Sequence, residues 1–509
     1  MADEYLATAG PSAGTAESRR RVLIRLGGEL GTKSTRTRRK FLTVLVANAA
    51  RALRAAGLHA RVRQEWSRIW VDGDDVAGIR EVVASLFGVH SATEVVELRL
   101  TSLDRLVGDL AALYRAQVRG RTFGVRARRL GRSDVSPQEL AVALGAALHP
   151  GSAGVDLDAP QVEVAVMVGA DRAWAALDRT DGPGGLPLGT GGVALALFSG
   201  GFDSPVAAWH VMRRGVEMEM VHFELGGGQV DESLAVASAL CRRWAPGVHT
   251  RVHVVDLGPV VAALVQRCDR RLRQVLLKRA MYRAASALAE ELGLEAMVTG
   301  EALAQVSTQT LRSLVVCEQA GRLPVLRPLI GMDKIEIIAL ARRIGTHQAS
   351  VTVQETCSIA DGKVITWPRI EAVLETEELV GEEVTEAWTR RQLEGRRVVD
   401  LAEWEPPLDL GAPAPEVEAV PEGALIVDVR EAYEGEPVGD LRLPYSVALE
   451  RLEDLDADRE YVLVCNNGLR SGALAGRLRE RGLRTWSLRG GLAALPAPVT
   501  RAAAAVPTA

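Results

Sequence analysis

Apolar residues are spaced differently in the two halves of the chain, and each spacing predicts its own architecture. In the first half, apolar and polar residues alternate over short runs such as residues 122–128, which indicates half-buried strands. Between these runs apolar residues recur at helical spacing, as over residues 35–56. From residue 193 onward, continuous apolar runs such as VALALF (193–198) alternate with helical segments. Such runs are typical of strands that are buried on both faces of a parallel sheet.

The first half divides into a tail and two predicted domains. Residues 1–19 consist mainly of small and polar residues and are expected to be a disordered tail. Over residues 20–98 the predicted elements follow the order β-α-β-β-α-β, which resembles a ferredoxin-like α+β unit. Residues 99–180 predict a second α/β domain, with strands over residues 122–128 and 161–168.

The second half predicts a doubly wound parallel sheet over residues 181–401. Its pattern includes one long helix, over residues 259–292. Residues 402–420 are rich in proline and acidic residues, which predicts an extended linker. A smaller α/β unit is expected over residues 421–509. The predicted fold class is therefore multidomain α/β.

Composition is typical of a soluble globular protein. Charged residues make up 25% and apolar residues 47%, and no run approaches the roughly 20 apolar residues that span a bilayer. The N-terminus lacks the apolar core of a signal peptide, so we expect a cytoplasmic protein without membrane contact. Five cysteines without paired spacing fit a reducing compartment, and no set of residues predicts a bound metal.

Positive charge is concentrated near the start of the chain. Residues 1–180 carry 26 Lys and Arg against 20 Asp and Glu, although the whole chain has a net charge of −4. Seven arginines follow one another without an intervening acid: Arg115, Arg119, Arg121, Arg126, Arg128, Arg129 and Arg132. Guanidinium groups match phosphate oxygens in bidentate hydrogen bonds, so this cluster fits a nucleic-acid backbone. A solvated basic surface would give the same pattern, and charge alone leaves both interpretations open.

The strongest local motif is SGGFDS, residues 199–204, which follows a buried strand and precedes a predicted helix. Gly200 and Gly201 allow a tight turn with exposed N–H groups, and Pro205 fits the first turn of a helix. Backbone donors at a helix N-terminus make a phosphate site. No Gly-Lys-Ser/Thr follows, so the loop is not a Walker A motif, and it resembles the PP-loop of ATP pyrophosphatases. The alternative is a Gly-rich turn of an ordinary α/β domain.

Several polar residues become candidates once this loop is taken as a phosphate site. Ser199 and Ser204 would hydrogen-bond the pyrophosphate, and Asp203 would hold magnesium or orient the phosphates. Loops at the carboxyl end of parallel strands are where such sheets bind ligands. Further candidates for this edge or its helices are Lys278, Gly300, Gln309 and Lys334. Taken alone, Lys278 would more often be an ordinary surface lysine, and Lys334 is similarly ambiguous.

Two cysteines are candidates for chemistry. Cys465 ends an apolar strand and begins CNNGLRSG before a helix, so backbone N–H groups would stabilise its thiolate. With LIVDVRE (425–431) and LRGGL (488–492), this loop resembles a rhodanese domain, whose cysteine carries sulfur as a persulfide. Cys357 has polar neighbours and is either a reactive exposed thiol or an ordinary one. The remaining cysteines are expected to be packing residues: Cys241, Cys268 and Cys317.

The order of these motifs resembles the tRNA 4-thiouridine synthetases (the bacterial ThiI type), in the long form with a C-terminal rhodanese domain. The resemblance runs through nearly the whole chain from residue 20. Its segments are RTFGVRARRLGRSDVSPQEL (121–140), GGLPLGTGGVALALFSGGFDSPVA (184–207), HFELGG (222–227), LLKRAMYRAAS (276–286), TGEALAQVSTQTL (299–311) and VLRPLIGMDKIEI (325–337). The first segment is similar to a THUMP domain, a tRNA-binding module, and the others are similar to the family's ATP domain.

The resemblance implies a reaction and the residues that perform it. ATP would adenylate the uridine at position 8 of tRNA, and persulfide sulfur on Cys465 would replace the oxygen to give 4-thiouridine. Asp203 and Lys334 match positions needed for activation, and Cys357 matches the cysteine that forms a transient disulfide with Cys465. The implied ATP contacts are Leu197, Phe198, Ser199, Gly200, Gly201, Asp203, Ser204, His222, Phe223, Lys278, Gly300 and Gln309.

The resemblance also implies cofactors and partners. These are ATP with Mg²⁺, tRNA, a cysteine desulfurase as sulfur donor, a thiol reductant such as thioredoxin, a thiazole-pathway sulfur carrier protein and a second copy of the chain. The family also supplies sulfur for the thiazole of thiamine, which is an alternative main role. Two further alternatives are a tRNA-binding protein with a decayed ATP site and an amide-forming PP-loop ligase. Intact SGGFDS, Lys278 and Lys334 argue against the first, and Cys465 argues against the second.

Overall fold

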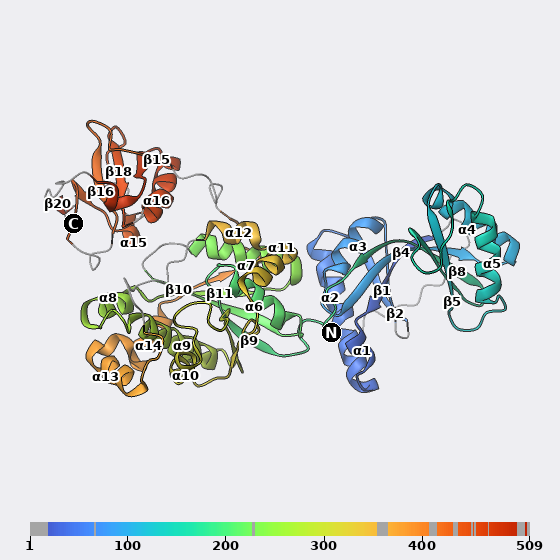
Figure 1. Cartoon of the computed structure of the whole chain (residues 1–509), viewed down its shortest axis with the longest axis horizontal. Helices are drawn as coiled ribbons and strands as arrows, with labels where there is room; N and C mark the ends of the chain where they lie inside the picture. The colour runs from blue at the N-terminus through green and yellow to red at the C-terminus, as the bar shows by residue number, and fades with distance from the viewer. Residues whose placement is uncertain are drawn as a thin grey trace. The chain divides into compact units, whose positions relative to one another are not determined.

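The computed structural model divides the chain into two compact units, Met1–Pro187 and Leu188–Ala509, whose elements are drawn in Figure 1. The described residues are 19–65, 68–225, 230–353, 365–406, 415–430, 436–448, 451, 455–466, 468–495 and 504–505. Within these ranges, no helix combines the length and the apolar character that a bilayer span requires.

An eight-stranded sheet is the frame of the first unit. Its strands lie in the order β2-β3-β1-β4-β8-β7-β5-β6. Their bounds are β1 (Arg19–Leu26), β2 (Ala60–Glu65), β3 (Arg68–Gly73), β4 (Val89–Arg99), β5 (Thr122–Arg129), β6 (Gly154–Val155), β7 (Val162–Val168) and β8 (Arg172–Asp181). The helices are α1 (Gly28–Gly31), α2 (Thr35–Ala55), α3 (Val76–Ala84), α4 (Leu103–Val118) and α5 (Pro137–Leu148).

The part of this unit from β1 to β4 confirms the ferredoxin-like prediction. The longer elements follow the order β1, α2, β2, β3, α3, β4, and β1 pairs antiparallel with both β3 and β4. Val22 of β1, Leu45 of α2 and Val83 of α3 are fully buried in one hydrophobic core. The apolar faces that the sequence pattern indicates therefore meet between these helices and the sheet.

The sheet does not end at β4. This strand pairs antiparallel with β8, from Ser91 opposite Asp181 to Arg99 opposite Arg172. The segments expected as separate domains, residues 20–98 and 99–180, consequently share one sheet. Strand β8 was not predicted, because its sequence RAWAALDRTD has short alanines where a strand usually has β-branched residues.

The second unit contains the predicted doubly wound sheet, in the order β13-β12-β9-β10-β11-β14. The bounds are β9 (Val193–Leu197), β10 (Glu217–Glu224), β11 (Arg251–Asp256), β12 (Met297–Val298), β13 (Val325–Leu326) and β14 (Arg397–Asp400). The strands pair in parallel, except that β14 is antiparallel to β11. The chain adds β10 and β11 on one side of β9 and then crosses to β12 on the other. Ligands bind such sheets at this switch point, beyond the carboxyl ends of the strands.

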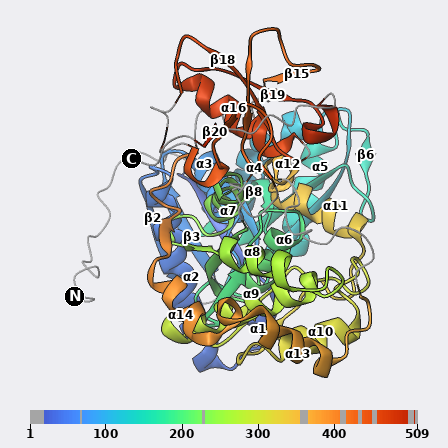
Figure 2. The ribbon, with the colours of Figure 1, turned by 90° about the vertical axis from the view of Figure 1, so that its left-hand side faces the viewer.

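Helices lie between and beyond these strands. They are α6 (Asp203–Met212), α7 (Val230–Trp244), α8 (Gly258–Arg267), α9 (Arg273–Glu291), α10 (Leu311–Glu318), α11 (Lys334–Ile344), α12 (His347–Thr352), α13 (Ile370–Val380) and α14 (Glu386–Glu394). Arg279 of α9 hydrogen-bonds Glu377 of α13 and the Val316 carbonyl of α10, which joins three helices that are labelled in Figure 2. These contacts of Arg279 hold α9 against α10 and α13.

The prediction of one long helix over residues 259–292 is wrong, because α8 and α9 are separate. Cys268 has an extended backbone, with φ −113° and ψ 140°, so helical hydrogen bonding stops there. Asp269 Oδ1 then accepts the Arg271 N–H at 2.9 Å, which is a local alternative to the helix ladder. The apolar spacing continues across this break, and for that reason it does not reveal the break.

A third, smaller sheet lies at the end of the chain, in the order β15-β19-β18-β16-β17-β20. The bounds are β15 (Glu416–Val417), β16 (Leu425–Asp428), β17 (Leu441–Arg442), β18 (Glu460–Val464), β19 (Arg484–Leu488) and β20 (Ala504–Ala505), with α15 (Tyr445–Ala448) and α16 (Leu469–Glu480). Its strands pair in parallel. The expected small α/β unit is present, and its assignment as a rhodanese domain stays a prediction.

Candidate active site

The SGGFDS loop lies directly beyond β9, at the switch point of the sheet. Gly200 has φ +79°, a conformation that side chains other than hydrogen disfavour. A Cβ at Gly200 would also lie 2.8 Å from Ser233 Cα, so α7 packs against the bare backbone of the loop. Helix α6 begins at Asp203, and its first N–H groups face the loop side. The loop therefore has the backbone of an anion site.

The serines of the loop support its shape. Ser204 Oγ accepts the Ser199 N–H at 3.3 Å, and Ser233 Oγ donates to the Ser199 carbonyl at 2.8 Å. Ser204 is buried, whereas the Ser199 side chain is more accessible. These bonds close the turn on itself and hold its amides in place. Direct contact of Ser199 and Ser204 with a pyrophosphate remains a prediction.

Two residues predicted to act in activation lie in contact. Lys334 Nζ is 2.8 Å from Asp203 Oδ1 and 3.0 Å from Oδ2. Lys334 is the first residue of α11, which Asp333 and Glu336 fix through a capping box. The Lys334 ammonium also lies 5.8 Å from the ring centroid of Phe202. The structure thus brings together an acid and a base that are 131 positions apart in the sequence.

Gly300, just beyond β12, packs directly on the start of α6. A Cβ there would lie 2.8 Å from both the Asp203 carbonyl carbon and Ser204 N. Backbone atoms in a helix cannot move aside as a flexible side chain can. Glycine is therefore needed at this position so that the β12 loop can approach the phosphate loop.

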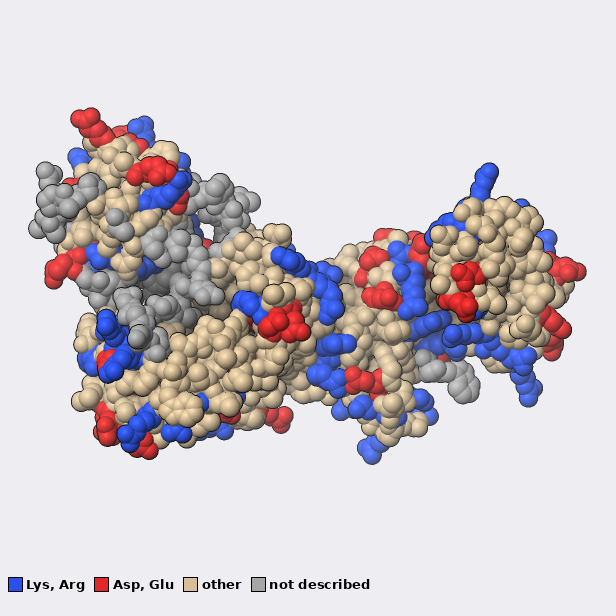
Figure 3. Space-filling model, in the orientation of Figure 1, with Lys and Arg blue, Asp and Glu red and all other residues tan. Residues whose placement is uncertain are grey.

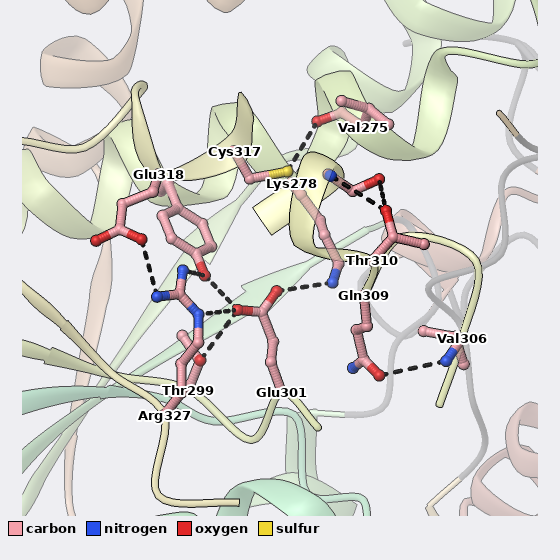
Figure 4. A network of polar contacts seen from close by, with 12 residues as sticks. Val275, Lys278, Thr299, Glu301, Val306, Gln309, Thr310, Cys317, Glu318 and Arg327 are labelled. Carbon is pink, nitrogen blue, oxygen red and sulfur yellow. Dashed lines mark hydrogen bonds and ion pairs between the residues drawn. The ribbon is translucent and has the colours of Figure 1, made fainter. Parts of the chain in front are cut away.

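Beside Gly300 lies a charged network that sequence reasoning missed (Figure 4). Glu301 is only 6% exposed, and its Oε1 accepts Lys278 Nζ at 2.9 Å. Its Oε2 accepts Tyr282 Oη at 2.6 Å and Arg327 Nε at 3.0 Å. Burial alone would raise the pKa of the Glu301 carboxyl, but the Lys278 ammonium and the hydrogen bonds hold it below its ordinary value. Glu301 is consequently an ionised anchor for two cations.

Gln309 closes the loop that follows Glu301. Its Oε1 accepts the Val306 N–H at 3.3 Å, and its own carbonyl accepts the Ala304 N–H at 2.9 Å. Ala304 has φ +60°, the one non-glycine residue with positive φ among the described residues. The buried Gln309 side chain is therefore held inside its own loop, and its contact with ATP stays a prediction.

Four further predicted ATP contacts lie at the carboxyl ends of β9 and β10: Leu197, Phe198, His222 and Phe223. His222, on β10, is buried, and its Nδ1 lies 3.0 Å from the Phe198 carbonyl, to which it can only donate. Burial lowers the pKa of His222, so its imidazole is neutral and Nε2 is left as an acceptor. Phe198 is buried, whereas Leu197 and Phe223 are partly exposed. Leu197 and Phe223 are thus the accessible apolar side chains of this set, and contact of the four residues with ATP stays a prediction.

Helix α12 also contacts the loop. Ser350 Oγ donates to the Gly201 carbonyl at 3.4 Å, and the His347 ring lies 5.3 Å from the ring of Phe202. Cys357 lies outside the described residues, five positions after the end of this helix at Thr352. Its role therefore stays a prediction.

Cys465 follows β18 and is fully buried. Ser471 Oγ lies 3.5 Å from the Cys465 Sγ. The Cys465 carbonyl accepts the Leu492 N–H at 2.9 Å. A Cβ at Gly491 would clash with the Cys465 carbonyl oxygen, so the two loops that are similar to rhodanese motifs touch at a glycine. The other described cysteines are buried, as predicted. Burial raises the pKa of Cys241 to about 12, which suits a packing thiol.

The seven predicted RNA-binding arginines lie on α4 (Arg115), between α4 and β5 (Arg119 and Arg121), on β5 (Arg126, Arg128 and Arg129) and in the loop after β5 (Arg132). Figure 3 shows the Lys and Arg side chains of one face of the molecule in blue. All are exposed except Arg126, which is half-buried. Arg121 donates to the Gln161 carbonyl at 2.9 Å and Arg126 to the Leu157 carbonyl, so these two also support the fold. Their contact with RNA stays a prediction.

A cavity of about 420 Å³ extends this basic surface within the first unit. Five arginines line it, of which the predicted set contains two: Arg25, Arg38, Arg68, Arg128 and Arg129. Burial lowers the pKa of Arg25, and the positive charges of Arg128 and Arg179 lower it further. Clustered like charges are unfavourable without a counter-anion, so the cavity suits a phosphate group. Of the other three, Arg38 belongs to a second basic group of the sequence, residues 36–40, whereas Arg25 and Arg68 have no such signal.

Metal binding finds little support from the protein side chains. Across the part of the chain that the structure describes, no group of three His, Cys, Asp or Glu side chains is arranged to hold an ion. Asp203 is the acid of the phosphate loop, and its two oxygens face Lys334. A Mg²⁺ ion would consequently need most of its ligands from nucleotide phosphates and water.

Two family models match the chain. Residues 189–381 match "Thiamine biosynthesis protein (ThiI)", and residues 21–93 match "ThiI ferredoxin-like domain". A protein named tRNA sulfurtransferase from Desulfurococcus amylolyticus is 38% identical over 478 residues, which cover 92% of this chain and 97% of that protein. The tRNA sulfurtransferase of Pyrobaculum aerophilum is 35% identical, over 92% of this chain and 96% of its own length.

A solved structure is also similar. It is a 4-thiouridine synthetase in complex with RNA and with bound ATP, and it aligns with a TM-score of 0.66. The two chains are 27% identical, and the alignment covers 75% of this chain and 99% of that one. A Pyrococcus horikoshii protein, PH1313, aligns with a TM-score of 0.51 at 21% identity, which indicates the fold alone.

Proposed function

The chain belongs to the ThiI family of tRNA sulfurtransferases, and we propose that it adenylates a tRNA uridine with ATP and replaces the oxygen with sulfur to form 4-thiouridine. Uridine 8 is the proposed target. The observation that carries this proposal is the contact of Lys334 with Asp203 beside the SGGFDS loop, at the switch point of the sheet. An ammonium, a carboxylate and the amides of a glycine turn converge there, and this arrangement supports a phosphate-binding role.

Adenylation is the first step of the proposed reaction. The uracil oxygen attacks the α-phosphate of ATP, and pyrophosphate leaves. The amides of the loop and Lys334 would stabilise negative charge on the phosphates, and Asp203 would orient Lys334 or hold Mg²⁺. The bound Mg²⁺ would neutralise phosphate charge. An AMP ester is a far better leaving group than the carbonyl oxygen that it replaces.

Sulfur transfer is the second step. A cysteine desulfurase would load Cys465 as a persulfide, with the extra sulfur outermost. Cys357 would attack the inner sulfur, so that the outer sulfur leaves with its electron pair, attacks the activated carbon and displaces AMP. A Cys357–Cys465 disulfide remains, and a thiol reductant such as thioredoxin would reduce it. Ser471, 3.5 Å from Cys465 Sγ, is a donor that could stabilise the thiolate.

The tRNA would bind the basic surface of the first unit. The exposed arginines of β5 and the five arginines of the cavity support this assignment, because phosphate is the ligand that such a surface fits. A role in thiazole sulfur supply would use Cys465 in the same way, through a sulfur carrier protein. A decayed ATP site is disfavoured, because Lys334 and Asp203 remain in contact.

One assay tests the proposal. Protein, ATP, a sulfur donor and unmodified tRNA are incubated, and the near-ultraviolet absorbance of thiouridine is followed. Absence of thiolation with retained tRNA binding would favour the decayed binder. Cys465→Ala should abolish multiple turnover and leave pyrophosphate release intact, and loss of both would contradict the two-step scheme. Cys357→Ala should prevent the internal disulfide, which mass spectrometry detects.

A further inference from the structure

We propose that Glu301 is a positioning residue that holds the Lys278 ammonium in place to bind the nucleotide. The inference rests on the proposed use of ATP at the phosphate loop. Glu301 itself would not touch ATP, because its carboxylate oxygens are occupied by protein donors. It would act through Lys278 alone.

The position of Glu301 is fixed relative to the phosphate loop. It directly follows Gly300, which packs so closely on the backbone of Asp203 and Ser204 that no Cβ would fit between them. The backbone of Glu301 is therefore joined directly to a residue that is in close contact with the start of α6. The carboxylate is also only 6% exposed, so solvent does not compete for it.

The two carboxylate oxygens of Glu301 do different things (Figure 4). Oε2 accepts three donors, from Tyr282 at 2.6 Å, Arg327 at 3.0 Å and Thr299 at 3.2 Å. Oε1 accepts Lys278 at 2.9 Å. One oxygen thus anchors the carboxylate in the protein, and the other presents a fixed negative charge to the lysine.

Lys278 needs such an anchor. Its long side chain would otherwise lose considerable rotamer entropy on binding a ligand. The side chain is 18% exposed, so Lys278 is partly accessible to a ligand rather than free in solvent. An ammonium has three N–H donors, and Glu301 takes one, which leaves two for phosphate or ribose oxygens. The contact therefore orients Lys278 without occupying it.

The substitution Glu301→Gln separates these two functions. The amide NH₂ cannot face the three donors at Oε2, so it must take the Oε1 place and point a donor at Lys278. The anchor is kept, and the contact with Lys278 is replaced by a donor–donor clash. Glu377→Gln is the matched control, because Glu377 is a carboxylate with only 11% of its side chain exposed that pairs with Arg279 and Arg283 of the same helix α9.

The test measures ATP affinity of the full chain by calorimetry, without RNA. Glu301→Gln should weaken ATP binding about 10- to 100-fold, the usual effect of losing a hydrogen bond to a charged group, and Glu377→Gln should leave it within about twofold. In a Lys278→Met background, Glu301→Gln should have no further effect. Independent effects of the two substitutions, or unchanged affinity of Glu301→Gln, would overturn the assignment.

Two controls keep the result interpretable. If Glu301→Gln does not fold, Tyr282→Phe removes one anchoring hydrogen bond and keeps the ring, and it should weaken ATP binding about 3- to 10-fold. Unchanged ATP affinity of a folded Tyr282→Phe would then overturn the proposal. Failure of the wild-type chain to thiolate tRNA, with ATP binding intact, would instead reject the proposed function and leave this inference standing.

Discussion

Gly300→Ala should disable adenylation more than it destabilises the protein. The new Cβ would meet the Asp203 carbonyl carbon and Ser204 N at 2.8 Å, where ordinary contacts lie beyond 3.4 Å. Since both atoms belong to the backbone of α6, the β12 loop or the phosphate loop must shift by roughly 0.6 Å or more, and overpacking of this kind costs about 1–3 kcal/mol. A displacement on the order of 1 Å at a reacting centre can reduce the rate about 100-fold.

The measurement combines pyrophosphate release with thermal unfolding. Gly300→Ala should lower kcat/KM for ATP about 10- to 100-fold, while Tm falls by roughly 2–12 °C. Gly331→Ala is the control, because Gly331 lies in the loop before α11 and a Cβ there meets nothing within 4 Å. If Gly300→Ala matched this control in both rate and Tm, the close approach of the two loops would not matter for activity.

Three further outcomes are expected. Lys334→Met should reduce pyrophosphate release about 100- to 1,000-fold but change the free energy of unfolding by less than about 1 kcal/mol, because its pair is partly exposed; a large loss of Tm would contradict this. Arg128→Ala should weaken tRNA binding and reduce by about 1 the slope of log affinity against log salt concentration. Arg105→Ala is the control and should change neither, because Arg105 pairs with Asp109 of its own helix. His222 has a lowered pKa, so below about pH 6.5 the unfolded chain binds a proton that the folded chain excludes. The free energy of unfolding should therefore decrease as the pH falls from about 7 to 5, and His222→Gln should flatten this decrease.

The phosphate loop was predictable because its chemistry is local. An apolar run ending at Phe198, two glycines and Pro205 already specify strand, turn and helix. Helix α6 begins at Asp203, inside the predicted motif. Gly200 has a positive φ, which glycine adopts more readily than any other residue.

Other features depend on contacts that a linear pattern does not contain. Cys268 breaks α8 from α9 although the apolar spacing runs on, because Asp269 offers the backbone an alternative partner. The pairing of Lys278 with Glu301 joins positions 23 apart, and each alone is an ordinary charged residue. The burial of Glu301 and its contact with Lys278, rather than the type of either residue, mark the pair as a candidate for function.

The pairing of β4 with β8 determines where the chain can be cut. A fragment ending after Arg99 would leave a whole edge of β4, from Ser91 onward, with unpaired N–H and C=O groups. Such an edge recruits other strands, so the ferredoxin-like part alone would aggregate. A fragment that ends at Pro187 keeps β4 covered along its length. The two segments of the first unit therefore share one sheet, and a fragment made for expression should keep both of them.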